Sequence, residues 1–175
     1  MSFQGTIEAN CPSCTDGFEA PIWSFVHGGK DALLRDQAKA HGVDPARLIF
    51  AGRAFPAEYM ARLALPDLFL DTLPYNAGTT ANDILWMGTP ILTCSGRTYI
   101  SRMCGSLLTA VGLPDLITFS LEEYERRAVQ LGRNPKRIAS HKRYLAQYRT
   151  ENALFDVPQL VRDLEHALSD TLHRP

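Results

Sequence analysis

Residues 70–90 read LDTLPYNAGTTANDILWMGTP, and this stretch decides the fold of the chain. The pattern predicts the end of a buried strand, a turn rich in Pro, Asn and Gly, and then a helix that opens on two threonines. Such a helix start presents free backbone N–H groups and the positive end of the helix dipole at one point. It is therefore a candidate binding site for a phosphate or pyrophosphate.

The same residues allow a second interpretation of the helix start. Thr80 and Asp83 have the spacing of a helix capping box, which stabilises a helix with no ligand present. The two interpretations are compatible, because a side-chain cap leaves other N–H groups free. Gly78 has no Cβ and lets a ligand approach the backbone closely. Asp83 lies about one turn into the helix, where its carboxylate can accept hydrogen bonds from ribose hydroxyls.

On both sides of this stretch, short apolar segments alternate with helical patterns at even intervals. The apolar character of residues 48–51 predicts a strand buried on both faces. The alternation predicts an α/β fold, in which a Rossmann-like parallel sheet carries helices on both faces. The expected strands are residues 22–26, 48–51, 68–70 and 91–94, and the expected helices are residues 31–41, 58–65, 80–87 and 99–111.

The last third of the chain predicts a helical C-terminal tail. Ser120 and Glu123 form a capping box, and Pro135 opens the next helix. Asp156 caps the final helix, whose apolar residues recur at helical spacing along one face. These residues are Val157, Leu160, Val161, Leu164 and Leu168. Residues 1–20 have no clear periodicity and are expected to be an irregular segment, whereas residues 21–175 are expected to form the folded domain.

Composition excludes several classes of function. The 175 residues carry a formal net charge of -1, so no general attraction to nucleic acid or to an anionic membrane surface is expected. No apolar run approaches the roughly 20 residues that a membrane span needs. The first residues lack the basic and apolar regions of a signal peptide, so a cytoplasmic location is expected.

The four cysteines and the arginines near the predicted strand ends give weaker signals. Cys11 and Cys14 have the spacing of half a zinc site or of a redox pair, but no second pair of ligands follows them. Cys94 and Cys104 are expected to be small core residues. Arg97 and Arg102 lie in and after the loop that follows the fourth strand, where an arginine can pair with a phosphate. No catalytic triad or metal-ligand spacing stands out.

The stretch at residues 70–93 closely resembles the signature of the C-terminal catalytic lobe of O-linked N-acetylglucosamine transferases, including bacterial homologues that follow tetratricopeptide repeats. Flanking segments agree with the same family, and the resemblance extends over about residues 22–172. The agreeing segments are residues 44–50, 96–102, 110–117 and 154–156.

This resemblance implies the C-terminal lobe of a two-lobed GT-B glycosyltransferase, in which UDP-GlcNAc binds mainly to the C-terminal lobe. Residues 21–175 would then be a Rossmann-like donor-nucleotide-binding lobe with C-terminal helices. By the same resemblance, Thr79 and Thr80 bind the diphosphate, Asp83 holds the ribose, and the backbone of Ala54 contacts the uracil. The donor is a substrate, and neither a metal nor another cofactor is expected.

Several positions depart from the family pattern. Gly78 stands where the family has a histidine that donates to the phosphate region of the donor. Tyr59 stands where a second histidine lies near the uracil, and its ring can still stack on the base. Pro56 replaces a lysine, and Lys30 follows the first strand instead of preceding it. The N-terminal lobe of the family, which serves the acceptor side, has no counterpart in the sequence.

Two functional hypotheses follow. The first is a UDP-sugar-binding lobe of a glycosyltransferase that resembles protein O-GlcNAc transferase, which acts on Ser and Thr hydroxyls of an acceptor protein. A partner would then supply the separate N-terminal lobe. The alternative is a catalytically inactive lobe that acts as a nucleotide-binding or protein-interaction module and self-associates through its exposed lobe face. Neither hypothesis involves nucleic acid or a membrane.

Overall fold

The computed structural model describes residues 22–24 and 31–172, with side chains for residues 31–172. The first unit of the chain contains β1 (Ile22–Ser24), α1 (Asp31–Ala40), the 3-10 helix η1 (Pro45–Arg47) and β2 (Leu48–Phe50). β1 and β2 pair in parallel, with Ile22 opposite Leu48 and Ser24 opposite Phe50. Arg35 of α1 lies over the ring of Phe50, 4.8 Å from its centroid, and so ties the helix to the sheet.

The second unit is built on a parallel sheet of three strands in the order β3-β4-β5. β3 (Phe69–Leu70) pairs with β4 (Ile91–Cys94), and β4 pairs with β5 (Ile117–Thr118). β4 is buried at all four positions, because it lies between two strands and between layers of helices. The carboxyl ends of these strands lie at one edge of the sheet, where ligands bind in open α/β folds.

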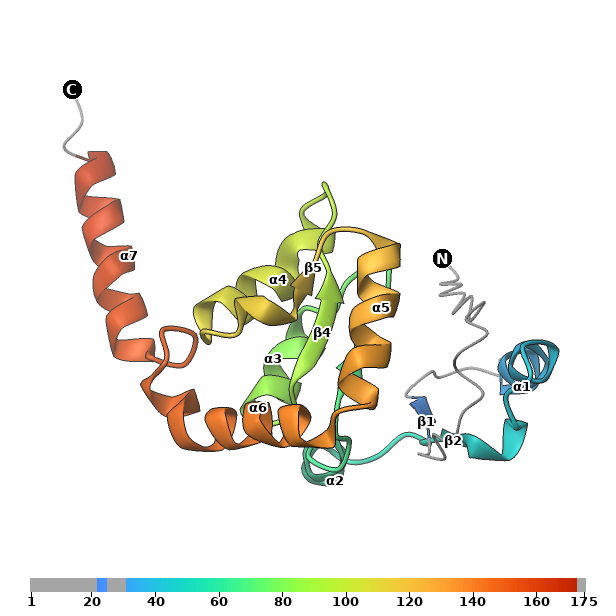
Figure 1. Ribbon diagram of the computed structural model, residues 1–175. Helices are drawn as coiled ribbons and strands as arrows, with labels where there is room; N and C mark the ends of the chain where they lie inside the picture. The colour runs from blue at the N-terminus through green and yellow to red at the C-terminus, as the bar shows by residue number, and fades with distance from the viewer. Residues whose placement is uncertain (1–21, 25–30, 173–175) are drawn as a thin grey trace.

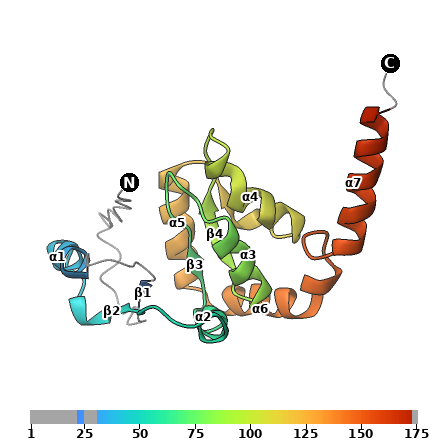
Figure 2. The same cartoon turned by 180° about the vertical axis from the view of Figure 1, so that it is seen from behind.

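Helices cover both faces of this sheet. Figure 1 shows α4 on one side of β4, α5 on the other, and α6 across one end, and Figure 2 shows α3 beside α4 from behind. The helices are α2 (Pro56–Leu63), α3 (Thr79–Trp86), α4 (Ile100–Ala110), α5 (Leu121–Gly132), α6 (Pro135–Tyr148) and α7 (Val157–Leu172), with 3-10 turns η2 (Pro114–Leu116) and η3 (Arg149–Glu151). The predicted Rossmann-like arrangement, a parallel sheet with helices on both faces and a helical tail, is therefore confirmed.

One hydrophobic core joins the sheet of the second unit to its helices. Its members come from β4 and from the inward faces of the helices packed against it, and each is at most 8% exposed. They include Leu63, Ile84, Leu85, Leu92, Leu108, Leu131 and Leu145. α3 ends against this core at Trp86, because Gly88 takes a positive φ of 83° that only glycine adopts readily. The core therefore fixes the direction of α3 and the position of its first turn.

The structure differs from the expected single sheet in its first unit. The described strands form two sheets, and no described strand joins the β1–β2 pair to β3. In both figures α1, β1 and β2 lie apart from the helices that cover β4. The expectation that residues 48–51 are buried on both faces was wrong, because Ile49 is 37% exposed and no residue of α1 is buried. Within the part of the chain that the structure describes, the side of β2 that carries Ile49 has no covering layer.

The helical tail has its predicted caps, but its last helix does not pack inward. Ser120 accepts a hydrogen bond from the Glu123 N–H, and Asp156 accepts one from the Gln159 N–H. α7 extends away from the body of the molecule, at the end opposite to α1 (Figures 1 and 2). Its apolar stripe is therefore open to solvent, with exposed fractions from 47% to 63% for Val157, Leu160, Val161, Leu164 and Leu168. No helix in the described residues is long and apolar enough to cross a membrane.

His141 of α6 gives the fold a predicted pH dependence. Burial lowers the pKa of His141, and the nearby Asp115 carboxylate, 3.5 Å away, only partly opposes this shift, while Arg137 adds to it. The unfolded chain has an ordinary histidine pKa of about 6.5 and so binds more protons than the folded chain in the window just below that pH. We expect the free energy of unfolding to fall as pH decreases through this window.

The measurement is urea unfolding at pH 7.5 and at lower pH, compared with His141→Gln, which has no imidazole to protonate. Between pH 7.5 and the lower pH, the free energy of unfolding of His141→Gln should fall less than that of the wild-type chain. An identical pH dependence in both proteins would contradict the role of His141.

Candidate nucleotide-binding site

The loop between β3 and α3 places an uncapped helix start at the carboxyl edge of the sheet. α3 begins at Thr79, and its N-cap residue is Gly78, which has no side chain to offer. The predicted capping box of Thr80 and Asp83 is therefore wrong, because Thr80 lies inside the helix and makes no cap. The N–H of Asn82 is the one that bonds back to the Gly78 carbonyl. The amides of Thr79 and Thr80, which are exposed residues, have no partner within the helix and remain available to a ligand, whereas Ala81 is fully buried.

Neighbouring helices at this edge close their own first turns. At the start of α4, the Ser101 N–H donates to Thr98 Oγ1 and the Thr98 N–H donates to Ser101 Oγ. At the start of α5, Ser120 Oγ accepts from the Glu123 N–H. α4 also has no side-chain hydrogen bond at its N-cap Tyr99, but Thr98 Oγ1 accepts from the Ser101 N–H in its first turn. The N-cap Gly78 of α3 has no side chain that could do the same, so the positive end of α3 is open.

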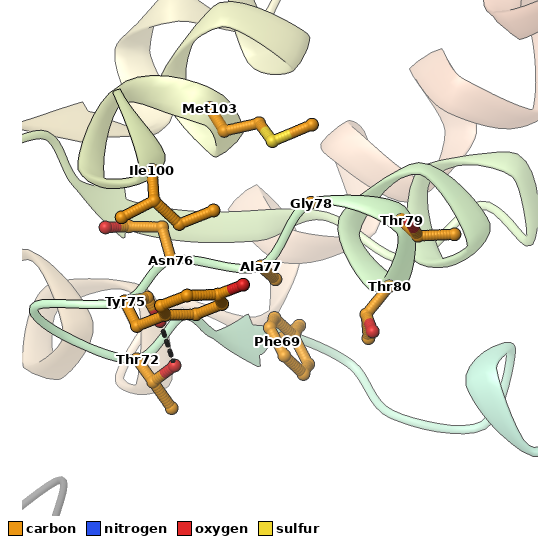
Figure 3. Close-up of a pocket in the computed structure, with 10 residues that line it drawn as sticks. All are labelled: Phe69, Thr72, Tyr75, Asn76, Ala77, Gly78, Thr79, Thr80, Ile100 and Met103. Carbon is orange, nitrogen blue, oxygen red and sulfur yellow. Dashed lines mark hydrogen bonds between the residues drawn. The ribbon is translucent and has the colours of Figure 1, made fainter. Parts of the chain in front are cut away.

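A pocket of about 520 Å³ opens in front of this helix start. Figure 3 shows α4 on one side of the loop and aromatic side chains on the other, with the two threonines at the beginning of α3. The lining residues come from β3, the loop, α3 and α4, and they are Phe69, Thr72, Tyr75, Asn76, Ala77, Gly78, Thr79, Thr80, Ile100 and Met103. Gly78, Thr79 and Thr80, three of the predicted site residues, are thus brought together in one pocket.

Met103 of α4 fills the space beside Gly78. A Cβ built on Gly78 would lie 2.9 Å from Met103 Sδ and 3.2 Å from its Cε. A larger residue at position 78 would therefore require the end of the Met103 side chain to move, which a flexible thioether can do. In Figure 3 the Met103 side chain extends over the loop near Gly78.

The pocket has no charged side chain among its described lining residues. Arg97 and Arg102, the arginines considered from the sequence, are exposed and are not among the lining residues. The positive end of α3 is therefore the main attraction that this pocket offers to an anion.

The other predicted site residues are not among those that line this pocket. Asp83 is half-buried in α3, just beyond its first turn. Tyr59 lies in α2, where its ring packs partly against the core. Ala54 is half-buried in the segment before α2. Cys11 and Cys14 lie outside the described residues, and within the described ones no cluster of three potential metal ligands occurs.

Sequence reasoning missed the buried carboxylate of Asp71, which follows β3. Asp71 is 3% exposed, and its Oδ2 accepts from Asn76 Nδ2 and from Thr93 Oγ1, both at 2.7 Å. Its Oδ1 accepts from the N–H groups of Thr72 and Ala77, at 2.9 and 2.8 Å. The sequence signal for this site is a charged residue directly after an apolar strand. A carboxylate at such a position is rarely buried without hydrogen-bond partners.

The groups around Asp71 are held in their neutral forms. Burial is the largest cause that raises the pKa of the Cys104 thiol and of the Tyr124 phenol, and the Asp71 charge raises both further. Tyr124 of α5 donates its hydroxyl to the Asp71 carbonyl at 2.8 Å. Cys94 and Cys104 are buried and free, as expected of core residues.

Comparisons with known proteins agree on one family. Relatives include UDP-N-acetylglucosamine–peptide N-acetylglucosaminyltransferase of Caenorhabditis elegans, 36% identical over 86% of this chain and 13% of the relative. A probable enzyme of the same name from Arabidopsis thaliana is 38% identical over 77% of this chain and 14% of the relative. The chain thus spans less than one sixth of the length of these two relatives.

The fold is shared with a solved structure of the same kind. A mutant of the O-GlcNAc transferase of Thermobaculum terrenum matches with a TM-score of 0.74 and 30% identity, over 81% of this chain and 27% of that protein. The model of glycosyl transferase family 41 matches residues 22–164. The chain therefore belongs to glycosyl transferase family 41.

Proposed function

We propose that this chain is the donor-binding lobe of a family 41 glycosyltransferase and that it binds the diphosphate of a UDP-sugar at the start of α3. The observation that carries this proposal is the uncapped first turn of α3, which opens onto the pocket. Helix N-termini bind phosphate because free N–H groups and the helix dipole point at the same place. Thr79 and Thr80 add two hydroxyls there.

The remaining contacts of the donor follow the family resemblance. Asp83 would accept hydrogen bonds from the ribose hydroxyls, since it lies one turn beyond the proposed diphosphate position. The backbone of Ala54 and the ring of Tyr59 would contact the uracil, and a loop movement would bring them toward the pocket. The lining residues include no carboxylate to hold a divalent cation, so we propose binding without a metal.

The names of the relatives support UDP-GlcNAc as the donor and a protein as the acceptor. We propose the same donor and Ser or Thr hydroxyls as acceptors, in an assembly where a second lobe completes the active centre. A departing diphosphate develops negative charge that preorganised positive groups must stabilise. The described lining residues supply a helix dipole and threonine hydroxyls but no positively charged side chain, so the positive charge is expected from the second lobe.

Isothermal titration calorimetry with UDP and with uridine tests the donor site. UDP should bind and uridine should bind much more weakly, because uridine lacks the diphosphate that the helix start would hold. Binding of UDP should survive an excess of EDTA. No heat of binding for UDP at millimolar concentration would refute the proposal, and loss of binding with EDTA would refute its metal-independence.

Position 78 gives a gain-of-function prediction. Gly78→His combined with Met103→Ala should strengthen UDP binding roughly tenfold, because a hydrogen bond to a charged group contributes about 1.5–3 kcal/mol. Gly78→His alone should gain less, because Met103 occupies the space beside position 78. The measurement is the Kd for UDP, with Met103→Ala alone as the control. Equal affinity for UDP in the wild-type chain, the two single variants and the double variant would contradict this account of position 78.

The open apolar stripe of α7 favours the alternative, a module that acts through protein contacts. Half-exposed Leu and Val side chains along one helix face mark an interaction surface. We propose that a second lobe of the same enzyme covers this stripe, and that free chains self-associate through it when no such lobe is present. This surface is compatible with nucleotide binding, because it lies on α7 and not at the pocket.

Light scattering tests the self-association. The wild-type chain should form dimers or larger species at micromolar concentration, and Leu160→Asp with Leu164→Asp should shift it to monomers by placing charges in the stripe. Both substitutions replace residues that are more than half exposed, so folding should be unaffected. A strictly monomeric wild-type chain would contradict the self-association.

A further inference from the structure

We infer that Asp71 is a positioning residue for the proposed phosphate site, because its buried carboxylate sets where the first turn of α3 begins. This inference rests on the proposed function and extends it to a residue that has no contact with the ligand. Asp71 is not among the residues that line the pocket. It acts through the loop backbone at Asn76 and Ala77.

The four hydrogen bonds of the carboxylate connect the loop to the sheet. Ala77, which donates its N–H to Asp71 Oδ1 at 2.8 Å, directly precedes the N-cap Gly78. Asn76 Nδ2 donates to Asp71 Oδ2 and also to Thr93 Oγ1, both at 2.7 Å. It reaches the Cys94 carbonyl of β4 at 3.2 Å as well. Asn76 is therefore held to β4 both directly and through the Asp71 carboxylate, and Ala77 is held by the same carboxylate.

A second set of contacts fixes Asp71 itself. Tyr124 of α5 donates to the Asp71 carbonyl, and the Asp71 N–H donates to the Leu92 carbonyl of β4 at 3.0 Å. Thr93, which donates to the carboxylate, accepts a bond at its own carbonyl from Thr118 Oγ1 of β5. Contacts with β4, β5 and α5 together thus fix the position of the helix start. Sites held this way keep the geometry that a ligand needs, within a fraction of an ångström.

The chemistry requires a carboxylate and not merely a residue of that shape. All four partners of the Asp71 side chain donate hydrogen bonds, and an ionised carboxylate only accepts them. An amide of nearly equal volume would turn one oxygen into an N–H₂ group that faces these donors. Asp71→Asn should therefore release either the Ala77 N–H or the Asn76 amide while the packing volume stays almost unchanged.

A matched control separates positioning from general destabilisation. Thr89 lies at the other end of α3, is fully buried, and donates its hydroxyl to the Leu63 carbonyl at 2.7 Å. Thr89→Val removes this buried hydrogen bond without touching the loop. Thr93→Val removes one donor to the Asp71 carboxylate and one acceptor for Asn76 Nδ2, and it leaves the Ala77 contact in place. It serves as a milder variant if Asp71→Asn fails to fold.

The experiment measures two quantities in the full chain: the hydrogen exchange rate of the Ala77 amide and the Kd for UDP. Asp71→Asn should speed Ala77 exchange and weaken UDP binding, each roughly tenfold or more, whereas Thr89→Val should change neither by more than about threefold at a similar loss of thermal stability. The effects of Thr93→Val on Ala77 exchange and on the Kd for UDP should lie between those of Asp71→Asn and Thr89→Val.

Each outcome of this experiment either supports or overturns the inference. Unchanged Ala77 exchange in Asp71→Asn, or equal losses of UDP affinity in Asp71→Asn and Thr89→Val, would overturn the inference. If Asp71→Asn does not fold, Thr93→Val must exceed Thr89→Val in both quantities, or the inference fails. If the wild-type chain does not bind UDP, the proposed function fails, and the Ala77 exchange rates alone decide whether Asp71 holds the loop.

Discussion

Thr80→Glu is expected to abolish detectable UDP binding and at the same time to stabilise the fold slightly. Thr80 is exposed in the first turn of α3, whose amides have no side-chain cap. A carboxylate there interacts favourably with the helix dipole, by about 0.3–1 kcal/mol. It also stands next to the proposed diphosphate, where two unit charges about 4 Å apart near a protein surface repel by roughly 4 kcal/mol. The expected loss of UDP affinity is therefore more than about 100-fold.

Thr80→Gln is the matched control, because it has nearly the size of glutamate without the charge. It should reduce UDP affinity by less than about tenfold, since it removes one neutral hydroxyl. The measurements are calorimetry with UDP and thermal unfolding of all three proteins. Thr80→Glu with wild-type affinity would show that the diphosphate lies elsewhere, and equal losses in both variants would show that charge is not the cause.

Leu92→Ala is expected to lower the free energy of unfolding by about 2–5 kcal/mol, which is the usual cost of such a truncation in a core. Leu92 of β4 is 0% exposed and belongs to the cluster that joins the sheet to the helices. For a domain of this size the melting temperature should fall by roughly 5–15 °C. The measurement is urea unfolding and thermal unfolding followed by circular dichroism.

Leu164→Ala is the same substitution on the open stripe of α7, where Leu164 is 56% exposed. In dilute, monomeric protein it should change the free energy of unfolding by no more than about 0.5 kcal/mol, because no cavity forms and alanine favours helix. A loss above 1 kcal/mol in Leu164→Ala would show that α7 is covered in the free chain. If Leu92→Ala lowers the free energy of unfolding by less than about 1 kcal/mol, this would contradict the central place of β4 in the core.

The second unit of the fold was largely predictable because its signals are local and strong. The apolar run at residues 91–94 predicted β4 with the bounds that the structure has. Ser120 and Asp156 capped their helices as predicted, because a cap depends only on residues three positions apart. The pattern also predicted the helix α3 at the two threonines, and the structure has it there. The helix begins one residue earlier than expected, at Thr79.

Other features depend on distant contacts, and the sequence did not predict them. Thr80 and Asp83 fit a capping box by spacing, yet the helix starts one residue earlier because the loop is held at Ala77 by Asp71. The partners of the Asp71 carboxylate lie as far away as Thr93, so spacing alone does not identify them. The burial of a stripe depends on what covers it, and so α7 has the amphipathic pattern of a packed helix without the packing.

The family was predictable because its signature occupies one continuous stretch, and the comparisons confirm it. The site residues remain predictions, because Gly78, Thr79 and Thr80 line a pocket while Ala54, Tyr59 and Asp83 lie outside its lining.

The central claim is that the start of α3 holds the diphosphate of a UDP-sugar, and an NMR titration of the labelled chain with UDP tests it most directly. The account predicts that the backbone amides of Thr79 and Thr80 show the largest chemical-shift changes, and that uridine at the same concentration leaves them nearly unchanged. Absence of shifts at these amides at millimolar UDP, or the largest shifts far from α3, would contradict it.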